Sequence, residues 1–125
     1  EHDCFSDNTH NSHYYDGLGI RNIYFGQYQR LDGSTLQGPS LHDAVAARDP
    51  ETDAQMRDAL DATMTALGKL KSLAEAPQAQ PFDTLIAPGN EQGRTLLVAI
   101  LNALSQQTRT LEDAAASLGI NPNAI

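Results

Sequence analysis

The sequence has no tryptophan, a single cysteine and few basic residues. Cys4 has no second cysteine within the 125 residues to pair with, so an intrachain disulfide is excluded. Eight Lys and Arg against sixteen Asp and Glu give a formal net charge of −8, which argues against a nucleic-acid partner because phosphate backbones are bound by basic patches. No apolar run approaches the roughly 20 residues of a transmembrane helix, so no membrane span is expected in this chain.

Alanine and leucine make up most of the hydrophobic content of 40%, whereas aromatic residues contribute only 6%. This composition is typical of helices that pack through small and aliphatic side chains. A length of 125 residues is sufficient for one domain with one modest core. The composition therefore favours an all-α fold.

The clearest helical period lies in residues 90–118. Asn90 precedes this stretch as a plausible cap, and Gly119 followed by Pro122 is a typical helix stop. Apolar or small residues recur there at alternating steps of four and three, which predicts one long amphipathic helix. The predicted buried stripe consists of Leu97, Leu101, Leu104, Thr108, Leu111, Ala115 and Leu118.

Three further helices are expected upstream. Asp49 as a cap and Pro50 at the first helical position predict a second long helix over residues 50–76, which Pro77 ends. Ser40 caps a short helix over residues 40–48. Residues 9–25 form the third long helix, in which Gly17 and Gly19 indicate a bend or the close approach of another backbone.

The predicted fold class is an all-α helical bundle of three long helices plus a short one, forming one lobe of a two-lobed helical protein. Residues 26–39 are expected to form a loop or a short hairpin. The proline-rich stretch 76–89 is expected to be a long connection, pinned to the core by Phe82, Leu85 and Ile86.

Residues that could bind a metal or transfer a proton are concentrated in the first sixteen positions, which include three of the four histidines. On a helix, Asp3, Asp7 and His10 would share one face at i, i+4 and i+7, so that a carboxylate orients an imidazole or both bind one cation. The alternative is structural: Ser6 and Asp7 cap the helix, and His10 forms an internal hydrogen bond. His42, on the short helix, is interpreted as a surface residue.

Several segments together resemble the second half of imelysin-like proteins, the M75 peptidase family. The phrase Phe5-Ser-Asp-Asn-Thr-His10 is the most specific element of this resemblance. The other matching segments are Glu1 to Cys4, Gly19 to Gly26, Asp32-Gly33, Gly38 to Leu41 and Phe82-Asp83. The resemblance covers essentially the whole chain, and because the chain begins at Glu1 and not at Met, we expect residues 1–125 to be the C-terminal helical domain of a longer protein.

The resemblance implies a periplasmic protein, soluble or anchored to the outer membrane as a lipoprotein, that is linked to iron acquisition. The family motif Gly-x-His-x-x-Glu is absent, because no histidine here is followed by Glu three residues later. The resemblance places the site residues at a lobe interface shared with an N-terminal half, with His10 and Asp7 as the ligands of a divalent metal, iron or zinc. The residues carried over are Ser6, Asp7, Asn8, Thr9 and His10.

Three functions stay open from the sequence. The first is an accessory role in iron uptake through binding of a metal or small ligand, with iron-uptake components as partners. The second is a metallopeptidase, the activity for which the family was named, although a zinc peptidase needs about three protein ligands and a general base that this chain does not display. The third is a non-catalytic helical packing module.

Overall fold

The computed structural model describes residues 2–76 and 80–121 and confirms the all-α bundle. Helix α1 is followed by a small antiparallel hairpin, a short helix α2, the long helix α3, a single turn α4 and the longest helix α5. The elements are α1 (Thr9–Phe25), β1 (Gln27–Gln29), β2 (Thr35–Gln37), α2 (Leu41–Arg48), α3 (Pro50–Ala74), α4 (Phe82–Leu85) and α5 (Glu91–Ser117).

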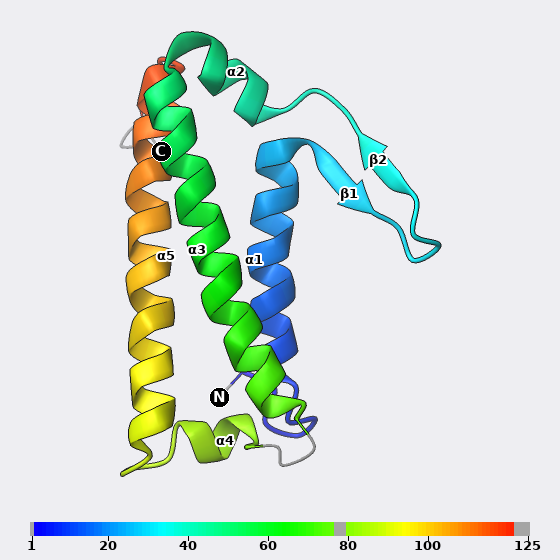
Figure 1. The fold of residues 1–125 in the computed structure, drawn as a ribbon, viewed down its shortest axis with the longest axis vertical. Coiled ribbons are helices and arrows are strands. Elements are labelled where there is room, and N and C mark those ends of the chain that lie inside the picture. Colours follow the sequence, from blue (N-terminus) through cyan, green and yellow to red (C-terminus); the bar gives the residue numbers. More distant parts are fainter. Residues whose placement is uncertain (1, 77–79, 122–125) are drawn as a thin grey trace.

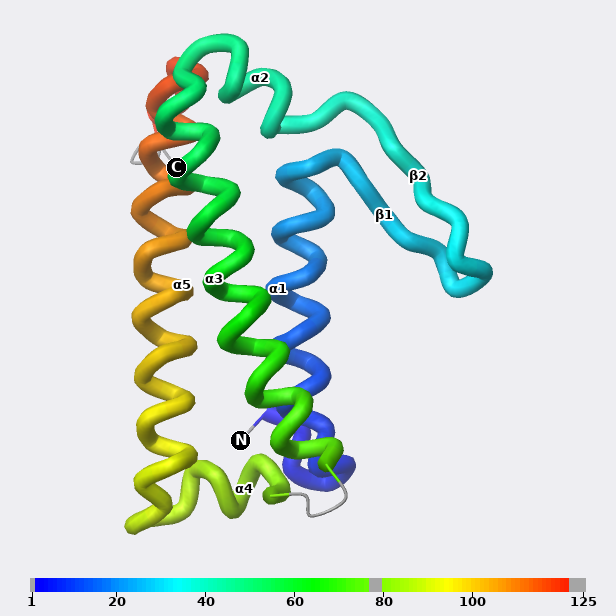
Figure 2. The backbone as a smooth tube through the Cα atoms, viewed as in Figure 1, coloured from blue at the N-terminus to red at the C-terminus, as the bar shows by residue number. Residues whose placement is uncertain are grey.

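The three long helices lie side by side with α3 in the middle (Figure 1). Helix α3 packs against both α1 and α5, whereas α1 and α5 make little direct contact. Because α1 and α3 run in opposite directions, the start of α1 lies at the same end of the bundle as the end of α3 and α4 (Figure 2). This end contains the segment singled out by the sequence.

The helix starts follow the predicted caps. Ser40, Asp49 and Asn90 each accept a hydrogen bond from the backbone N–H three residues later, at 2.9, 3.1 and 2.8 Å. Gly119, with φ of 80°, follows the end of α5 as expected. The proposed stops at Pro77 and Pro122 lie outside the described residues.

Two buried clusters form the core. One joins α1, α2, α3 and α5 around Tyr24, and the other joins α3, α4 and α5 around Leu67. Phe82 and Leu85 belong to the second cluster, which confirms that they hold the long connection onto the bundle. The same expectation for Ile86 was wrong, because this side chain is 43% exposed.

The buried face of α5 differs from the predicted stripe. Leu101 and Leu111 are 62% and 41% exposed, while Ile100, Gln107 and Thr110 are buried. Thr110 Oγ1 lies 3.4 Å from Met56 Sδ, which places this side of α5 against α3. The face of α5 that packs on α3 is therefore rotated from the predicted one and carries polar residues.

Gly17 brings α1 close to α3. A Cβ atom at this position would lie 2.6 Å from Leu67 Cδ1, so α1 packs closely there, against a side chain and not against another backbone as predicted. Gly19 has nothing within 4 Å of such an atom, so the prediction does not hold there.

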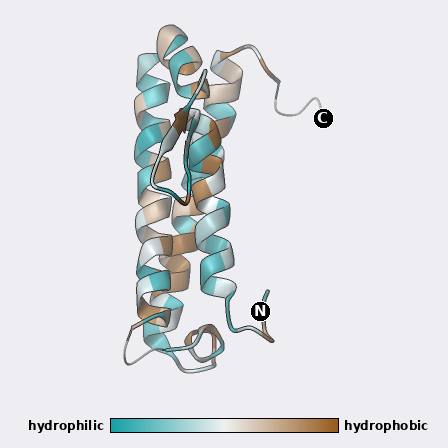
Figure 3. Ribbon diagram, turned by 90° about the vertical axis from the view of Figure 1, so that its right-hand side faces the viewer, coloured by the Kyte–Doolittle hydropathy of each residue, from teal (hydrophilic) through white to brown (hydrophobic). Residues whose placement is uncertain are grey.

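The segment between α1 and α2 is the short hairpin, which projects from the bundle (Figure 1). Gly26 begins it with φ of 60°, and a Cβ atom there would lie 2.7 Å from the carbonyl oxygens of Gly38 and Pro39. Figure 3 shows a hydrophobic (brown) segment at the tip of the hairpin. Leu31, which lies between β1 and β2 in the sequence, is fully exposed.

Candidate functional site

The segment before α1 is a series of turns and not a helix. Because α1 begins at Thr9, the expectation that Asp3, Asp7 and His10 share one helical face is wrong. Asp7 has φ of 48°, a left-handed conformation that a short polar side chain tolerates better than most. The cap residue of α1 is Asn8, so Ser6 and Asp7 do not cap it.

The five residues carried over from the family divide into two groups. Ser6, Asp7 and Asn8 are exposed, whereas Thr9 and His10 are buried. Thr9 Oγ1 accepts a hydrogen bond from the backbone N–H of Asp3 at 3.0 Å, so Thr9 holds the preceding turn in place. The segment thus presents polar side chains to solvent above a buried imidazole.

His10 is 8% exposed, and its Nδ1 atom is buried with no hydrogen-bond partner among the described residues. Its Nε2 atom lies 3.1 Å from Asn11 Nδ2 and 3.8 Å from Glu75 Oε1. The internal hydrogen bond expected in the structural alternative therefore satisfies one ring nitrogen at most. A buried, unpartnered ring nitrogen is costly, so it calls for an explanation, of which a bound water or ion is one.

Asn11 links this histidine to the end of α3. Its Nδ2 donates to Glu75 Oε1 at 3.0 Å, and its Oδ1 accepts from Lys71 Nζ. Lys71 also pairs with Glu75 at 2.5 Å, one helical turn away. The hydrogen bonds from Lys71 and Asn11 hold the pKa of the Glu75 carboxyl below its ordinary value.

A polar pocket of about 550 Å³ opens beside these groups. It is lined by Lys71, Asn8 and Asn11, together with His2, Ser12, Tyr15 and Asp16. Lys71, Glu75 and Asn11 were not identified from the sequence. The antiparallel order of the two predicted helices would have indicated them, since it brings residues near 10 and residues near 75 to the same end.

His13 lies one turn beyond His10 and is half-buried. Its ring centroid is 5.7 Å from that of His2 and 6.1 Å from that of Phe82. It therefore faces the N-terminal segment and α4, away from the Lys71–Glu75 pair.

A second polar cluster occupies the opposite end of the bundle, and it overturns the surface interpretation of His42. His42 Nδ1 lies 2.6 Å from Oδ1 of Asp53, which is 2% exposed. Tyr24 Oη donates to the same oxygen at 2.8 Å, and Arg57 Nε donates to Oδ2 at 3.0 Å. A buried carboxylate with three donors is fully satisfied, so this cluster fastens α1, α2 and α3 together.

Burial favours the neutral forms of both Asp53 and Tyr24, but the hydrogen bond between them shifts their pKa values in opposite directions. Burial acts to raise the pKa of Asp53, yet hydrogen bonds from His42 and Tyr24 and the nearby cations outweigh it, so this pKa lies below its ordinary value. Burial and the bond to an anionic acceptor both raise the pKa of Tyr24. The pair therefore persists as carboxylate and phenol.

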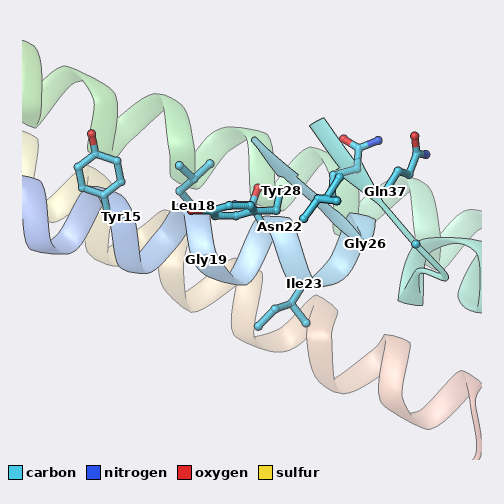
Figure 4. A pocket seen from close by; sticks show the side chains of 11 residues that line it. Tyr15, Leu18, Gly19, Asn22, Ile23, Gly26, Tyr28 and Gln37 are labelled. Carbon is cyan, nitrogen blue, oxygen red and sulfur yellow. The ribbon is translucent and has the colours of Figure 1, made fainter. Parts of the chain in front are cut away.

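An apolar cleft of about 720 Å³ lies between α1 and the hairpin (Figure 4). Leu18 and Ile23 of α1 and Tyr28 and Leu36 of the hairpin line it. None of the five carried-over residues belongs to this cleft. Tyr15 borders both the cleft and the polar pocket, on the flank of α1.

Within residues 2–76 and 80–121, no group of three or more His, Cys, Asp and Glu side chains is arranged to hold a metal ion. The described helices also include none that is long and apolar enough to cross a membrane. His10 with its unpartnered Nδ1 is therefore at most one ligand of an incomplete set.

The comparisons agree with the resemblance seen in the sequence. No curated protein sequence matches the chain. A family model described as imelysin, peptidase M75, matches residues 1–111, which include α1, α2, α3, α4 and most of α5. The chain therefore belongs to the imelysin family.

Proposed function

We propose that this chain contributes His10, with Asp7 beside it in sequence, to a binding site for a divalent metal, iron or zinc, or for a small polar ligand. The observation that carries the proposal is the buried Nδ1 atom of His10, which has no partner among the described residues. A bound ligand at this atom removes the cost of leaving it unsatisfied. Ser6, Asn8 and Thr9 orient the segment around it.

The residues fit a metal only in part. An imidazole nitrogen and a carboxylate are suitable ligands for iron or zinc, but a protein site uses three or four ligands. Glu75 Oε1 lies 3.8 Å from His10 Nε2, beyond hydrogen-bond distance, so the carboxylate would have to move closer to accept a hydrogen bond from the ring once Nδ1 binds a cation. The remaining ligands are proposed to come from an N-terminal half of the same protein.

The biological setting is proposed from the family alone. Imelysin-like proteins are linked to iron acquisition, and this supports a periplasmic protein, soluble or lipoprotein-anchored, that works with iron-uptake components. The polar pocket beside Lys71 is consistent with a ligand that carries hydrogen-bonding groups. We propose binding and no catalytic activity for this chain.

Calorimetric titration of the full-length protein, which includes the proposed N-terminal half, with Fe²⁺ under anaerobic conditions, and separately with Zn²⁺, tests the site. Removing one ligand by His10→Gln is expected to weaken binding at least about tenfold. His13→Gln, on the same helix and half-buried, is the matched control and is expected to bind as the wild type does.

The other outcomes are distinct. Equal binding by wild type and His10→Gln would remove the proposed site. If both His10→Gln and Asp7→Asn still bound metal and small ligands as the wild type does, the non-catalytic packing module would be the remaining function. Chelator-sensitive peptide cleavage that His10→Gln abolishes would instead establish the metallopeptidase.

A further inference from the structure

The hydrogen bonds around the buried His10 decide which of its two ring nitrogens carries a proton. In a neutral imidazole one nitrogen is a donor and the other is an acceptor. Nε2 lies 3.1 Å from Asn11 Nδ2, whereas Nδ1 is buried with no partner among the described residues. The atom of Asn11 that faces Nε2 therefore determines the form of the ring.

The orientation of the Asn11 amide follows from its two charged neighbours. Lys71 Nζ can only donate a hydrogen bond, and it contacts Asn11 Oδ1. The Glu75 carboxylate can only accept, and its Oε1 lies 3.0 Å from Asn11 Nδ2. Exchanging the oxygen and the nitrogen of this amide would set donor against donor at Lys71 and acceptor against acceptor at Glu75. The atom that faces His10 Nε2 is therefore the amide nitrogen, a donor.

A proton on His10 Nε2 is unfavourable in this arrangement. It would be opposed by the amide nitrogen of Asn11, and Glu75 Oε1 lies 3.8 Å away, beyond hydrogen-bond distance. A neutral ring therefore carries its proton on Nδ1. The buried atom without a partner is then an N–H donor, whereas a metal ligand needs a nitrogen without a proton.

We propose that Asn11 is a positioning residue that holds the proton of His10 on Nδ1, so that this atom suits an oxygen acceptor of a polar ligand better than a divalent metal. The inference rests on the proposed site at His10 and specifies its ligand class. For Nδ1 to bind a metal, the ring proton has to move from Nδ1 to Nε2, with the ring neutral before and after, and Asn11 Nδ2 has to withdraw.

Nuclear magnetic resonance of the metal-free full-length protein, with ¹⁵N-labelled histidine, reads the form of the ring directly. Protonated and bare ring nitrogens give separate signals, and the signals lost in His10→Gln are those of His10. At about pH 8, where an ordinary histidine is neutral, we expect the wild type to carry the proton on Nδ1. A proton on Nε2 would overturn the proposal.

The variant Asn11→Asp tests the role of the amide nitrogen. It keeps the size of the side chain and an oxygen for Lys71, but it replaces the donor that faces Nε2 with an acceptor. We expect the ring proton to move to Nε2 and to leave Nδ1 bare, as in sites where a carboxylate orients a metal-binding histidine. Asn22→Asp makes the same change about 16 Å further along α1 and is expected to leave the ring as in the wild type.

Titration of the same full-length variants with Zn²⁺ measures the consequence for a metal. Asn11→Asp is expected to bind Zn²⁺ at least about tenfold more tightly than the wild type, and Asn22→Asp is expected to bind as the wild type does. This gain is expected to vanish in the double variant His10→Gln/Asn11→Asp. A gain that persisted there would belong to the new carboxylate alone and would overturn the proposal.

The role of Asn11 and the proposed metal site succeed or fail separately. Equal ring spectra for Asn11→Asp and wild type, or a wild type that binds Zn²⁺ as tightly as Asn11→Asp, would overturn the role of Asn11 and leave the metal site standing. A wild type that shows the proton on Nδ1 and binds no Zn²⁺ would remove the metal site and support the role of Asn11. Circular dichroism establishes that each variant keeps its helices.

Discussion

His42 Nδ1 lies 2.6 Å from Asp53 Oδ1, which joins the short helix α2 to the first turn of α3. The same carboxylate accepts a hydrogen bond from the hydroxyl of Tyr24, in the last turn of α1. One buried acidic group thus fixes how three helices meet, at the end of the bundle opposite His10.

Asp53→Ala is expected to lower the free energy of unfolding by about 3 kcal/mol, because it leaves the Tyr24 hydroxyl and the His42 ring without their shared acceptor. Urea denaturation followed by circular dichroism measures the change. Asp61→Ala is the control: this exposed carboxylate on the same helix pairs with Arg21 at 3.4 Å, and its loss is expected to cost less than about 1 kcal/mol.

The depressed pKa of Asp53 predicts a specific acid sensitivity. A carboxyl whose pKa is lower in the folded state stabilises the fold above its unfolded pKa, about 3.9, and loses this contribution as pH falls through the folded pKa. The difference in unfolding free energy between wild type and Asp53→Asn should therefore shrink below about pH 4. A difference that stayed constant from pH 7 to pH 3 would contradict this assignment.

Gly93→Ala is expected to destabilise the protein by about 3 kcal/mol, because a Cβ atom would lie 1.9 Å from the carbonyl oxygen of Leu85, which is backbone. Gly19→Ala is the matched change in α1, where nothing lies within 4 Å. It is expected to stabilise the protein by about 0.5–1 kcal/mol through helix propensity. Thermal unfolding of both variants decides the prediction, which fails if their melting temperatures shift in the same direction.

Gly26→Ala is expected to displace the hairpin, because both the left-handed φ and the 2.7 Å approach of Gly38 O oppose a side chain there. Gly33→Ala has a similar positive φ but open space around it, so only the conformational cost of about 1 kcal/mol applies. Limited proteolysis should cut Gly26→Ala faster than Gly33→Ala in residues 26–39. Equal cutting rates would show that the contact with Gly38 is unimportant.

The helices were predictable because their ends carry local signals. Ser40, Asp49 and Asn90 are caps whose effect depends only on the next three residues. The hairpin was one of two alternatives left open, and α4 was not predicted because Phe82–Leu85 is too short to show a period.

The side of α5 that packs on α3 could not be predicted, because apolar residues cover more of the helix surface than one packing stripe needs. Leu97, Leu101, Leu104 and Ile100 all line a groove between α1 and α5, but Ile100 is buried whereas Leu101 is 62% exposed. Hydrophobicity alone assigned the leucine side to the core. The choice between the two sides depends on what α1 leaves uncovered, which is a tertiary property.

The candidate site was predictable only in part. The predicted helix over residues 9–25 placed His10 correctly near a helix start, yet its neighbour Glu75 at the end of α3 is 65 residues away in the sequence. His42 was assigned to the surface because its partner Asp53 lies on the next helix, beyond the i, i+4 range that sequence spacing tests.

The open groove between α1 and α5 has a kinetic consequence. Helix α1 and the hairpin are held to the rest of the chain mainly through α3 and α2, whereas α3 and α5 share their longest contact with each other. Amide hydrogens of α1 should therefore exchange with deuterium earlier than those of α3 and α5.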